Sequence, residues 1–193
     1  NDNKGEMQLT VSGFGLVDKI VDVAVTPVTD EAKLTITPID SGTEISENGE
    51  FKFDIKLTNN VDVGTTLKDN VIYIKAVENY KDTAEIETGK IYCIDVNGNK
   101  QPLSADGKFE IKDGYTIDNL PKFVYEAGVN RNGNVTINVT SENKELNADN
   151  YKEASGSTTI TVKPTVSSEI KIDKVQDGIE DGQMAGIKLN LTK

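Results

Sequence analysis

The stretch Phe51-Lys52-Phe53-Asp54-Ile55-Lys56-Leu57 places an apolar side chain at every odd position and a charged one at every even position. Successive side chains of a β-strand point to opposite faces, so this stretch has one apolar face and one polar face. Residues 135–139 repeat the pattern, which recurs in roughly ten short segments along the chain. Such alternation predicts antiparallel sheets with one dry and one wet face.

Turn signals separate these segments. Asn48-Gly49, Asp106-Gly107 and Asn132-Gly133 supply the positive φ angles that tight hairpins need. We therefore expect an all-β fold, an antiparallel immunoglobulin-like or jelly-roll β-sandwich with N- and C-terminal strand extensions. The segment 123–139 is interpreted as one hairpin around Asn132-Gly133. The best candidate helix, Asn143 to Ala154, is short and polar.

The chain of 193 residues is long enough for one large sandwich with an appended piece. We predict three zones. Residues 1–30 form an N-terminal extension, residues 31–164 form the sandwich, and residues 165–193 form a C-terminal strand pair packed on the sandwich. The chain begins without Met, which is typical of a processed or trimmed N-terminus, and its polar start also suits a spacer after a lipid-modified cysteine.

Charge and composition exclude several classes of function. The formal net charge is −11, which argues against binding nucleic acid or an anionic membrane surface. No apolar run is long enough to predict a transmembrane segment. An acidic, wet-faced β protein suits an extracellular location at the cell surface, where acidity keeps the chain soluble.

We find no catalytic constellation, no cofactor motif and no metal site in the sequence. The chain has no His, which excludes Ser-His-Asp and Cys-His arrangements and His-based zinc sites. Cys93 is the only cysteine and is interpreted as a small buried hydrophobe in a strand. Residues 95–99 have the oxygen spacing of half a calcium loop but are interpreted as a hairpin turn, and residues 177–182 are interpreted as another turn.

Three stretches resemble the immunoglobulin-like repeats of prokaryotic cell-surface proteins of the S-layer and adhesin type. They are residues 48–60, Asp118-Asn119-Leu120-Pro121, and residues 154–162. The resemblance covers about two thirds of the chain. It implies a surface-exposed structural or adhesive module without enzymatic activity, and extends to strand-exchanging pilus-type subunits.

Three sequons mark candidate glycosylation sites at Asn134, Asn138 and Asn190. The first two share the wet face of one predicted strand. Since an Asn- and Thr-rich chain also produces sequons by chance, we keep both interpretations open.

The N-terminal extension carries the sharpest hypothesis. Met7, Leu9 and Val11 alternate along a predicted strand, and Phe14 follows in a glycine-containing joint. Such a strand either joins its own sheet or adds to a sheet of another copy. The first hypothesis is therefore a non-enzymatic subunit of a cell-surface filament or pilus, assembled by β-strand exchange with these residues as donor. The alternative is a monomeric adhesin, S-layer or lipoprotein module that binds a host or cell-surface protein or glycan. An enzyme or its accessory domain ranks last.

Overall fold

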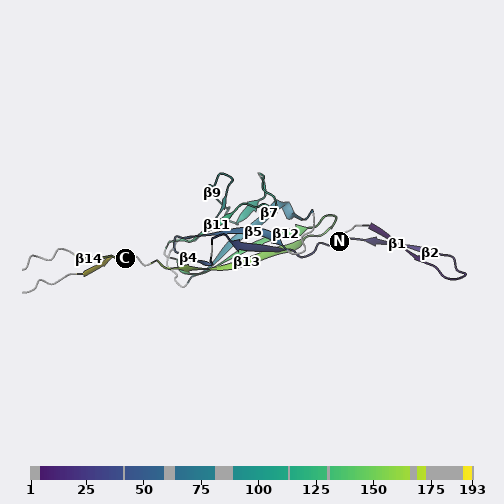
Figure 1. Ribbon diagram of the computed structural model, residues 1–193, viewed down its shortest axis with the longest axis horizontal. Helices are drawn as coiled ribbons and strands as arrows, with labels where there is room; N and C mark the ends of the chain where they lie inside the picture. Colours follow the sequence, from purple (N-terminus) through teal and green to yellow (C-terminus); the bar gives the residue numbers. More distant parts are fainter. Residues whose placement is uncertain are drawn as a thin grey trace, which may run out of the picture. The chain divides into compact units, whose positions relative to one another are not determined.

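The computed structural model describes residues 5–40, 42–58, 64–80, 89–112, 114–129, 131–165, 169–172 and 189–192. Within these ranges the regular structure is fifteen strands and one 3₁₀ turn, η1 (Lys68–Asn70) (Figure 1). The predicted all-β class is confirmed. The chain divides into two compact units, Asn1–Lys163 and Pro164–Lys193, and each is described by itself.

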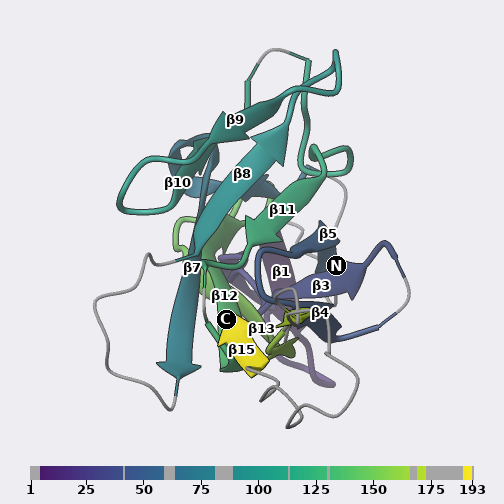
Figure 2. The same ribbon diagram turned by 90° about the vertical axis from the view of Figure 1, so that its left-hand side faces the viewer.

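The first unit is built on one eleven-stranded sheet. Its strands are β3 (Lys33–Pro38), β4 (Glu44–Ser46), β5 (Glu50–Thr58), β6 (Thr66–Leu67), β7 (Val71–Tyr80), β8 (Lys90–Ile94), β9 (Lys100–Pro102), β10 (Lys108–Glu110), β11 (Phe123–Glu126), β12 (Gly133–Lys144) and β13 (Lys152–Lys163). Along the sheet they follow the order β10-β7-β12-β13-β3-β5-β11-β8-β9, while β4 pairs with β13 and β6 pairs with β12. Figure 2 shows β8 beside β11, with β9 along the outer edge of β8.

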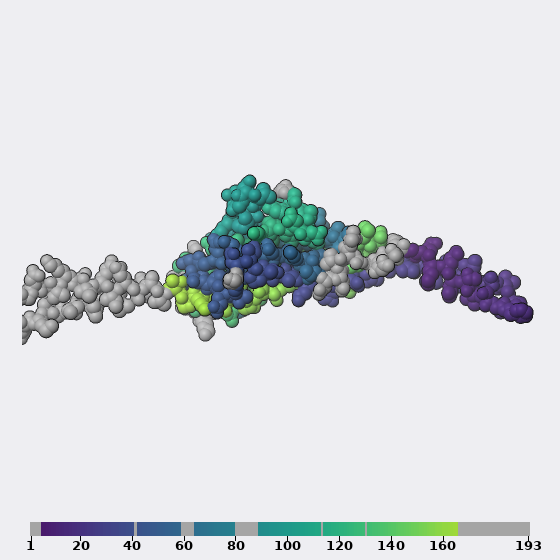
Figure 3. Space-filling view, viewed as in Figure 1, coloured from purple at the N-terminus to yellow at the C-terminus, as the bar shows by residue number. Residues whose placement is uncertain are grey.

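The sheet curls so that its two halves enclose one core. The turning point is the parallel contact between β13 and β3, where Ser155 lies opposite Lys33. Gly156 makes this approach possible, because a Cβ there would overlap the carbonyl oxygen of Leu34. The result is a sandwich whose halves are β10-β7-β12-β13 and β3-β5-β11-β8-β9. Residues of β8 to β10 gather on one side of it, teal in Figure 3.

The alternating pattern places the core as predicted. In β5, Phe51, Phe53 and Ile55 are buried while Lys52 and Lys56 are exposed. The inward residues of β12 are likewise fully buried: Val135, Ile137 and Val139. Both sets belong to one hydrophobic cluster, so the dry faces of the two halves pack against each other.

Aromatic rings join the halves of the core. The Phe123 ring lies 5.9 Å from that of Phe53 and 5.3 Å from that of Phe109, measured between centroids. The second pair meets edge to face at 89°, a geometry that adds to the gain from burial. Phe123 therefore connects β5, β10 and β11 through one side chain.

The predicted hairpin across residues 123–139 is wrong. β11 pairs with β5 and β8, whereas β12 pairs with β7 and β13. The chain between Glu126 and Gly133 crosses from one half of the sandwich to the other. Alternation of apolar residues determines which face of a strand is buried but not which strand lies beside it. The Asn132-Gly133 pair suggested a hairpin turn between two strands that do not pair with each other.

The predicted helix over Asn143 to Ala154 is also wrong. Asn143 and Lys144 end β12, and β13 begins at Lys152. The polar residues that suggested a short surface helix are partly buried, since Asn143 and Glu145 are 0% and 2% exposed. Tertiary contacts override local propensity in this segment.

The second unit contains one described strand pair, β14 (Glu169–Ile172) and β15 (Leu189–Thr192). They are antiparallel, with Ile170 opposite Leu191, in agreement with the predicted final pair of strands. The division into zones 1–30, 31–164 and 165–193, and the packing of the last zone on the sandwich, stay predictions.

We expect Phe123→Ala to destabilise the sandwich by about 3–5 kcal/mol, since it opens a cavity where three strands meet. Urea unfolding at low protein concentration measures the loss. Phe14→Ala is the matched control, because that ring is fully exposed and its removal should leave the unfolding midpoint unchanged. Equal midpoints for the two variants would contradict the central role of Phe123.

Candidate functional site

The N-terminal residues form a two-stranded hairpin of β1 (Gly5–Val11) and β2 (Lys19–Val25). Met7 lies opposite Val23 and Leu9 opposite Val21. The residues predicted as a single donor strand are thus already paired with β2. The assignment of Met7, Leu9 and Val11 as donor stays a prediction, now for a hairpin rather than one strand.

One face of this hairpin is apolar and exposed. Directly opposite residues of an antiparallel pair share a face. The register therefore gathers Met7, Leu9, Val11, Val21, Val23 and Val25 on one side, with Lys19 opposite Val11 at the end next to the turn. Their exposed fractions run from 37% for Val23 to 58% for Val11. A continuous apolar face of this kind marks an interaction site, and a lone two-stranded hairpin is at best marginally stable in water.

The opposite face of the hairpin is mixed. It carries Glu6, Gln8, Thr10 and Asp22 together with the apolar Ile20 and Ala24. The Gln8 Nε2 donates a hydrogen bond of 2.9 Å to Asp22 Oδ1. Phe14 does not belong to either face. It lies in the connecting turn, fully exposed, beside the exposed Leu16 and Val17.

A buried polar clamp fixes the chain just after the hairpin. Thr29 is 1% exposed. Its Oγ1 donates to the Asn150 carbonyl at 2.7 Å and accepts from the Glu145 N–H at 3.3 Å, while its own N–H donates to Asn150 Oδ1 at 3.0 Å. The next residue adds two bonds, from the Asp30 N–H to Glu145 Oε2 and from Asn143 Nδ2 to the Asp30 carbonyl.

This clamp determines where the hairpin is attached. Only residues 26–28 separate β2 from Thr29, and Thr29 is bound to residues at the end of β12 and in the connection to β13. Any partner that holds the hairpin is therefore linked to the longest strands of the sandwich through a short connection.

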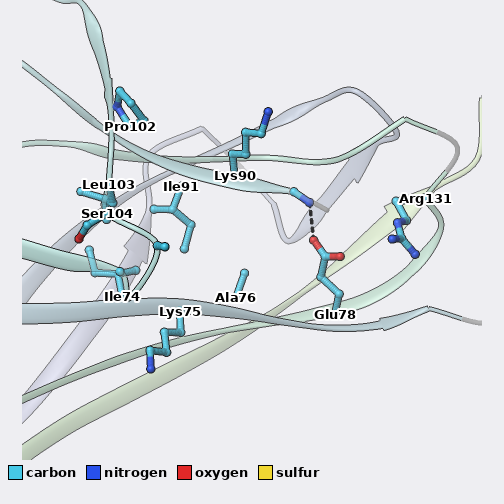
Figure 4. Close-up of a pocket in the computed structure, with 13 residues that line it drawn as sticks. Ile74, Lys75, Ala76, Glu78, Lys90, Ile91, Pro102, Leu103, Ser104 and Arg131 are labelled. Carbon is cyan, nitrogen blue, oxygen red and sulfur yellow. Dashed lines mark hydrogen bonds between the residues drawn. The ribbon is translucent and has the colours of Figure 1, made fainter. Parts of the chain in front are cut away.

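A groove of about 1030 Å³ opens between β7 and the segment from β8 to β10. Its floor is apolar and consists of Ile74 and Ala76 from β7, Ile91 from β8 and Leu103 (Figure 4). Lys75 on β7 and Lys90 on β8 point away from the groove in opposite directions, and Arg131 lines the end next to Glu78 (Figure 4).

Glu78 closes one end of the groove by joining the two halves of the sandwich. Its Oε1 accepts from the Gly89 N–H at 2.7 Å and from the Tyr125 hydroxyl at 2.9 Å. Tyr125 is fully buried, and a Cβ at Gly89 would overlap its ring. This carboxylate therefore has a structural task, and Gly89 is required for the close approach.

The other predicted positions lie apart from the hairpin and its clamp. Cys93 is half-buried against the core, and burial raises the pKa of its thiol. Asp95 Oδ1 accepts from the N–H groups of Asn97 and Asn99 at 2.9 and 2.8 Å, and the bond from Asn99 is the main cause that lowers the pKa of this carboxyl. The predicted turn at residues 95–99 is confirmed, while residues 177–182 lie outside the described residues.

The sequons fall on two strands. Asn134 is exposed on β12, where its Oδ1 accepts from the Thr161 hydroxyl at 3.2 Å, and Asn138 is partly exposed on the same strand. Asn190 lies in β15. Glycosylation at these positions stays a prediction.

Sequence reasoning found the hairpin residues but missed the clamp and the groove. The clamp consists of polar residues more than a hundred positions apart in the sequence, and the groove is assembled from separate strands. Among the described residues, no helix is sufficiently long and apolar to cross a membrane.

Comparisons with known proteins show a weak likeness at the level of solved structures. No protein-family model and no curated protein sequence matches the chain. Among solved structures, a conjugative transposon lipoprotein from Bacteroides eggerthii is 13% identical with a TM-score of 0.39, and the match covers 66% of this chain and 95% of that chain. The fold assignment therefore rests on the strand pairing described above.

We expect Thr29→Val to lower the free energy of unfolding by about 1–3 kcal/mol, because the Glu145 N–H and the Asn150 carbonyl lose a buried partner. Urea unfolding gives the change, and hydrogen exchange at Asp30 reports local opening. Thr26→Val is the matched control at an exposed position of the same connection. If both variants unfold at the same midpoint, the clamp does not hold the connection.

Proposed function

We propose that this chain is a non-enzymatic structural module of the cell surface that assembles with other copies through its N-terminal hairpin. The observation that carries the proposal is the exposed apolar face of β1 and β2. The strands of the sandwich bury their apolar faces in the core, whereas this hairpin leaves its own uncovered.

Typical free energies of apolar burial and of association indicate what such an assembly requires. Complete burial of an apolar side chain of this size contributes about 1.5–3 kcal/mol, so six that are about half exposed would contribute roughly 4–9 kcal/mol. Association itself costs about 4–15 kcal/mol. Burial of the hairpin face therefore needs help from main-chain hydrogen bonds at a sheet edge, which is the interaction that β-strand addition provides.

The extracellular, surface location is part of the proposal. The net charge of −11 keeps a protein with an exposed apolar hairpin in solution until its partner is met. The similarity of three stretches to the immunoglobulin-like repeats of surface proteins points in the same direction, and that family assignment stays a prediction.

The alternative is a monomeric adhesin, S-layer or lipoprotein module that binds a protein or glycan. The groove beside β7 favours it, since its volume of about 1030 Å³ is at the upper end of the range of ligand sites. Under this alternative the hairpin would contribute to stability or attachment rather than to assembly.

We expect the unmodified chain to show concentration-dependent self-association in sedimentation velocity, and Leu9→Asn to remain monomeric. The physical reason is that the substitution places an amide in the middle of the apolar face. Thr10→Asn is the matched control, because Thr10 lies next to Leu9 but on the other face of the same strand, and it should associate like the unmodified chain.

A chain that stays monomeric at all concentrations, or a Leu9→Asn variant that associates normally, would overturn the proposal. Binding of a glycan or protein by the monomeric Leu9→Asn variant would support the alternative instead.

A further inference from the structure

We propose that the apolar face of the β1–β2 hairpin packs against the same face of a second copy, with the two hairpins running in opposite directions. This inference rests on the proposed self-assembly and assigns the surface that receives the hairpin. Because that surface is the hairpin itself, assembly stops at a closed dimer with two-fold symmetry. The make-up of the two hairpin faces, the gain from burial and the course of the chain after the hairpin support it.

The two faces of the hairpin differ in how well each can contact a copy of itself. The face that contains Met7 and Leu9 is apolar along both strands, and its one charged residue, Lys19, lies at the end next to the turn. The other face carries Glu6 and Asp22. A two-fold contact places a surface against itself, and on this second face it would bring like charges together. The apolar face is therefore the one that suits a symmetric contact.

A second hairpin doubles the apolar surface that leaves water. Burial of one hairpin face contributes about as much as association costs, if the partner offers no apolar surface of its own. In the symmetric dimer both copies bury their six partly exposed side chains. The gain from burial then doubles, whereas the loss of translational and rotational freedom on joining two molecules occurs once. A second copy is thus the partner that makes the most of this face.

The charged end of the face determines the direction of packing. Lys19 and Val11 form the row next to the turn, and Gly5 and Val25 form the row at the base of the hairpin. Hairpins that ran in the same direction would bring the two Lys19 ammonium groups together. Opposite directions place Lys19 of each copy over the base row of the other. Gly5 leaves room there, since a Cβ at this position would meet no atom within 4 Å apart from its chain neighbours.

The connection to the sandwich supports the same direction. Residues 26–28 span about 10 Å when extended, and Thr29 is bound to Glu145 and Asn150 of the sandwich. Each sandwich therefore stays near the base of its own hairpin. Opposite directions put the two bases at opposite ends of the contact. Hairpins in the same direction would crowd two eleven-stranded sheets at one end, although packed sheets lie only about 10 Å apart.

The turn of the hairpin also gains a contact in this arrangement. Phe14, Leu16 and Val17 lie beyond the last row of the face and are 75–110% exposed. Because the last row of one hairpin lies over the base row of the other, these side chains reach the connection of the second copy. Val28 of that connection is also exposed. The dimer therefore covers apolar side chains that belong to neither face of the hairpin.

A mixing experiment tests whether the hairpin is the receiving surface. The Leu9→Asn chain carries a fluorescent label at its C-terminus and is titrated with the unmodified chain. We expect binding at least about tenfold weaker than to the labelled unmodified chain, because the labelled variant lacks an intact apolar face. The Thr10→Asn chain, labelled in the same way, is the matched control and should bind like the unmodified chain.

The outcomes of mixing separate this inference from the proposed function. A receiving site outside the hairpin would be intact in the Leu9→Asn chain, so binding at full strength would overturn the inference and leave the proposed assembly standing. In sedimentation, the mass of the unmodified chain should level off at two copies. Growth beyond two copies would also overturn the inference, whereas a chain that stays monomeric would contradict the proposed function itself.

Crosslinking tests the direction of packing. Gly5→Cys and Val11→Cys chains, both with Cys93→Ser, are treated with a bis-maleimide that spans about 10 Å, the spacing of packed sheets. We expect a crosslinked dimer from the mixture but not from either variant alone, because opposite directions bring position 5 of one copy over position 11 of the other. A crosslinked dimer from the Val11→Cys chain alone, or none from the mixture, would overturn the inference.

Discussion

The requirement that every apolar strand face be covered governs this protein. The long strands β5 and β12 are amphipathic, and alone each would expose a row of aliphatic or aromatic side chains to water. The sandwich meets the requirement by curling one sheet until Phe53 on one half and Ile137 on the other share a core. That closure depends on Gly156, where β13 and β3 approach too closely for any side chain. The hairpin of β1 and β2 is amphipathic in the same way but has no second layer, and its exposed face is the source of the functional hypothesis.

Buried polar groups determine how the exposed hairpin is connected to the sandwich. Thr29, Asn143 and Glu145 are buried at the junction and engage backbone groups of the connection. Buried polar networks of this kind specify one geometry because any slip leaves a donor or acceptor without a partner. The groove uses the same principle at Glu78, whose carboxylate holds Gly89 and Tyr125 together.

Alternation along the sequence was enough to predict the class of fold and the buried face of individual strands. Residues 51–57 and 135–139 lie as their pattern indicates, and Met7, Leu9 and Val11 share an apolar face that is left exposed. The sequence did not predict which strands pair, as the crossing between β11 and β12 shows. The hydrophobic period and the turn residues are local features, whereas strand pairing joins segments far apart in the sequence. The clamp was missed for a related reason. Its residues are polar, lie far apart in the sequence and look like surface loops until tertiary contacts bury them.

The parallel pairing of the first and last strands of the sandwich has a mechanical consequence. The chain enters the sandwich at β3 and leaves it at the end of β13, and both β3 and β4 run parallel to β13. Tension applied between the two ends of this unit would pull these neighbours in opposite directions along their length. Their hydrogen bonds would then be loaded together in shear rather than opened one after another. The fold is therefore suited to carry a tensile load from one end of the unit to the other.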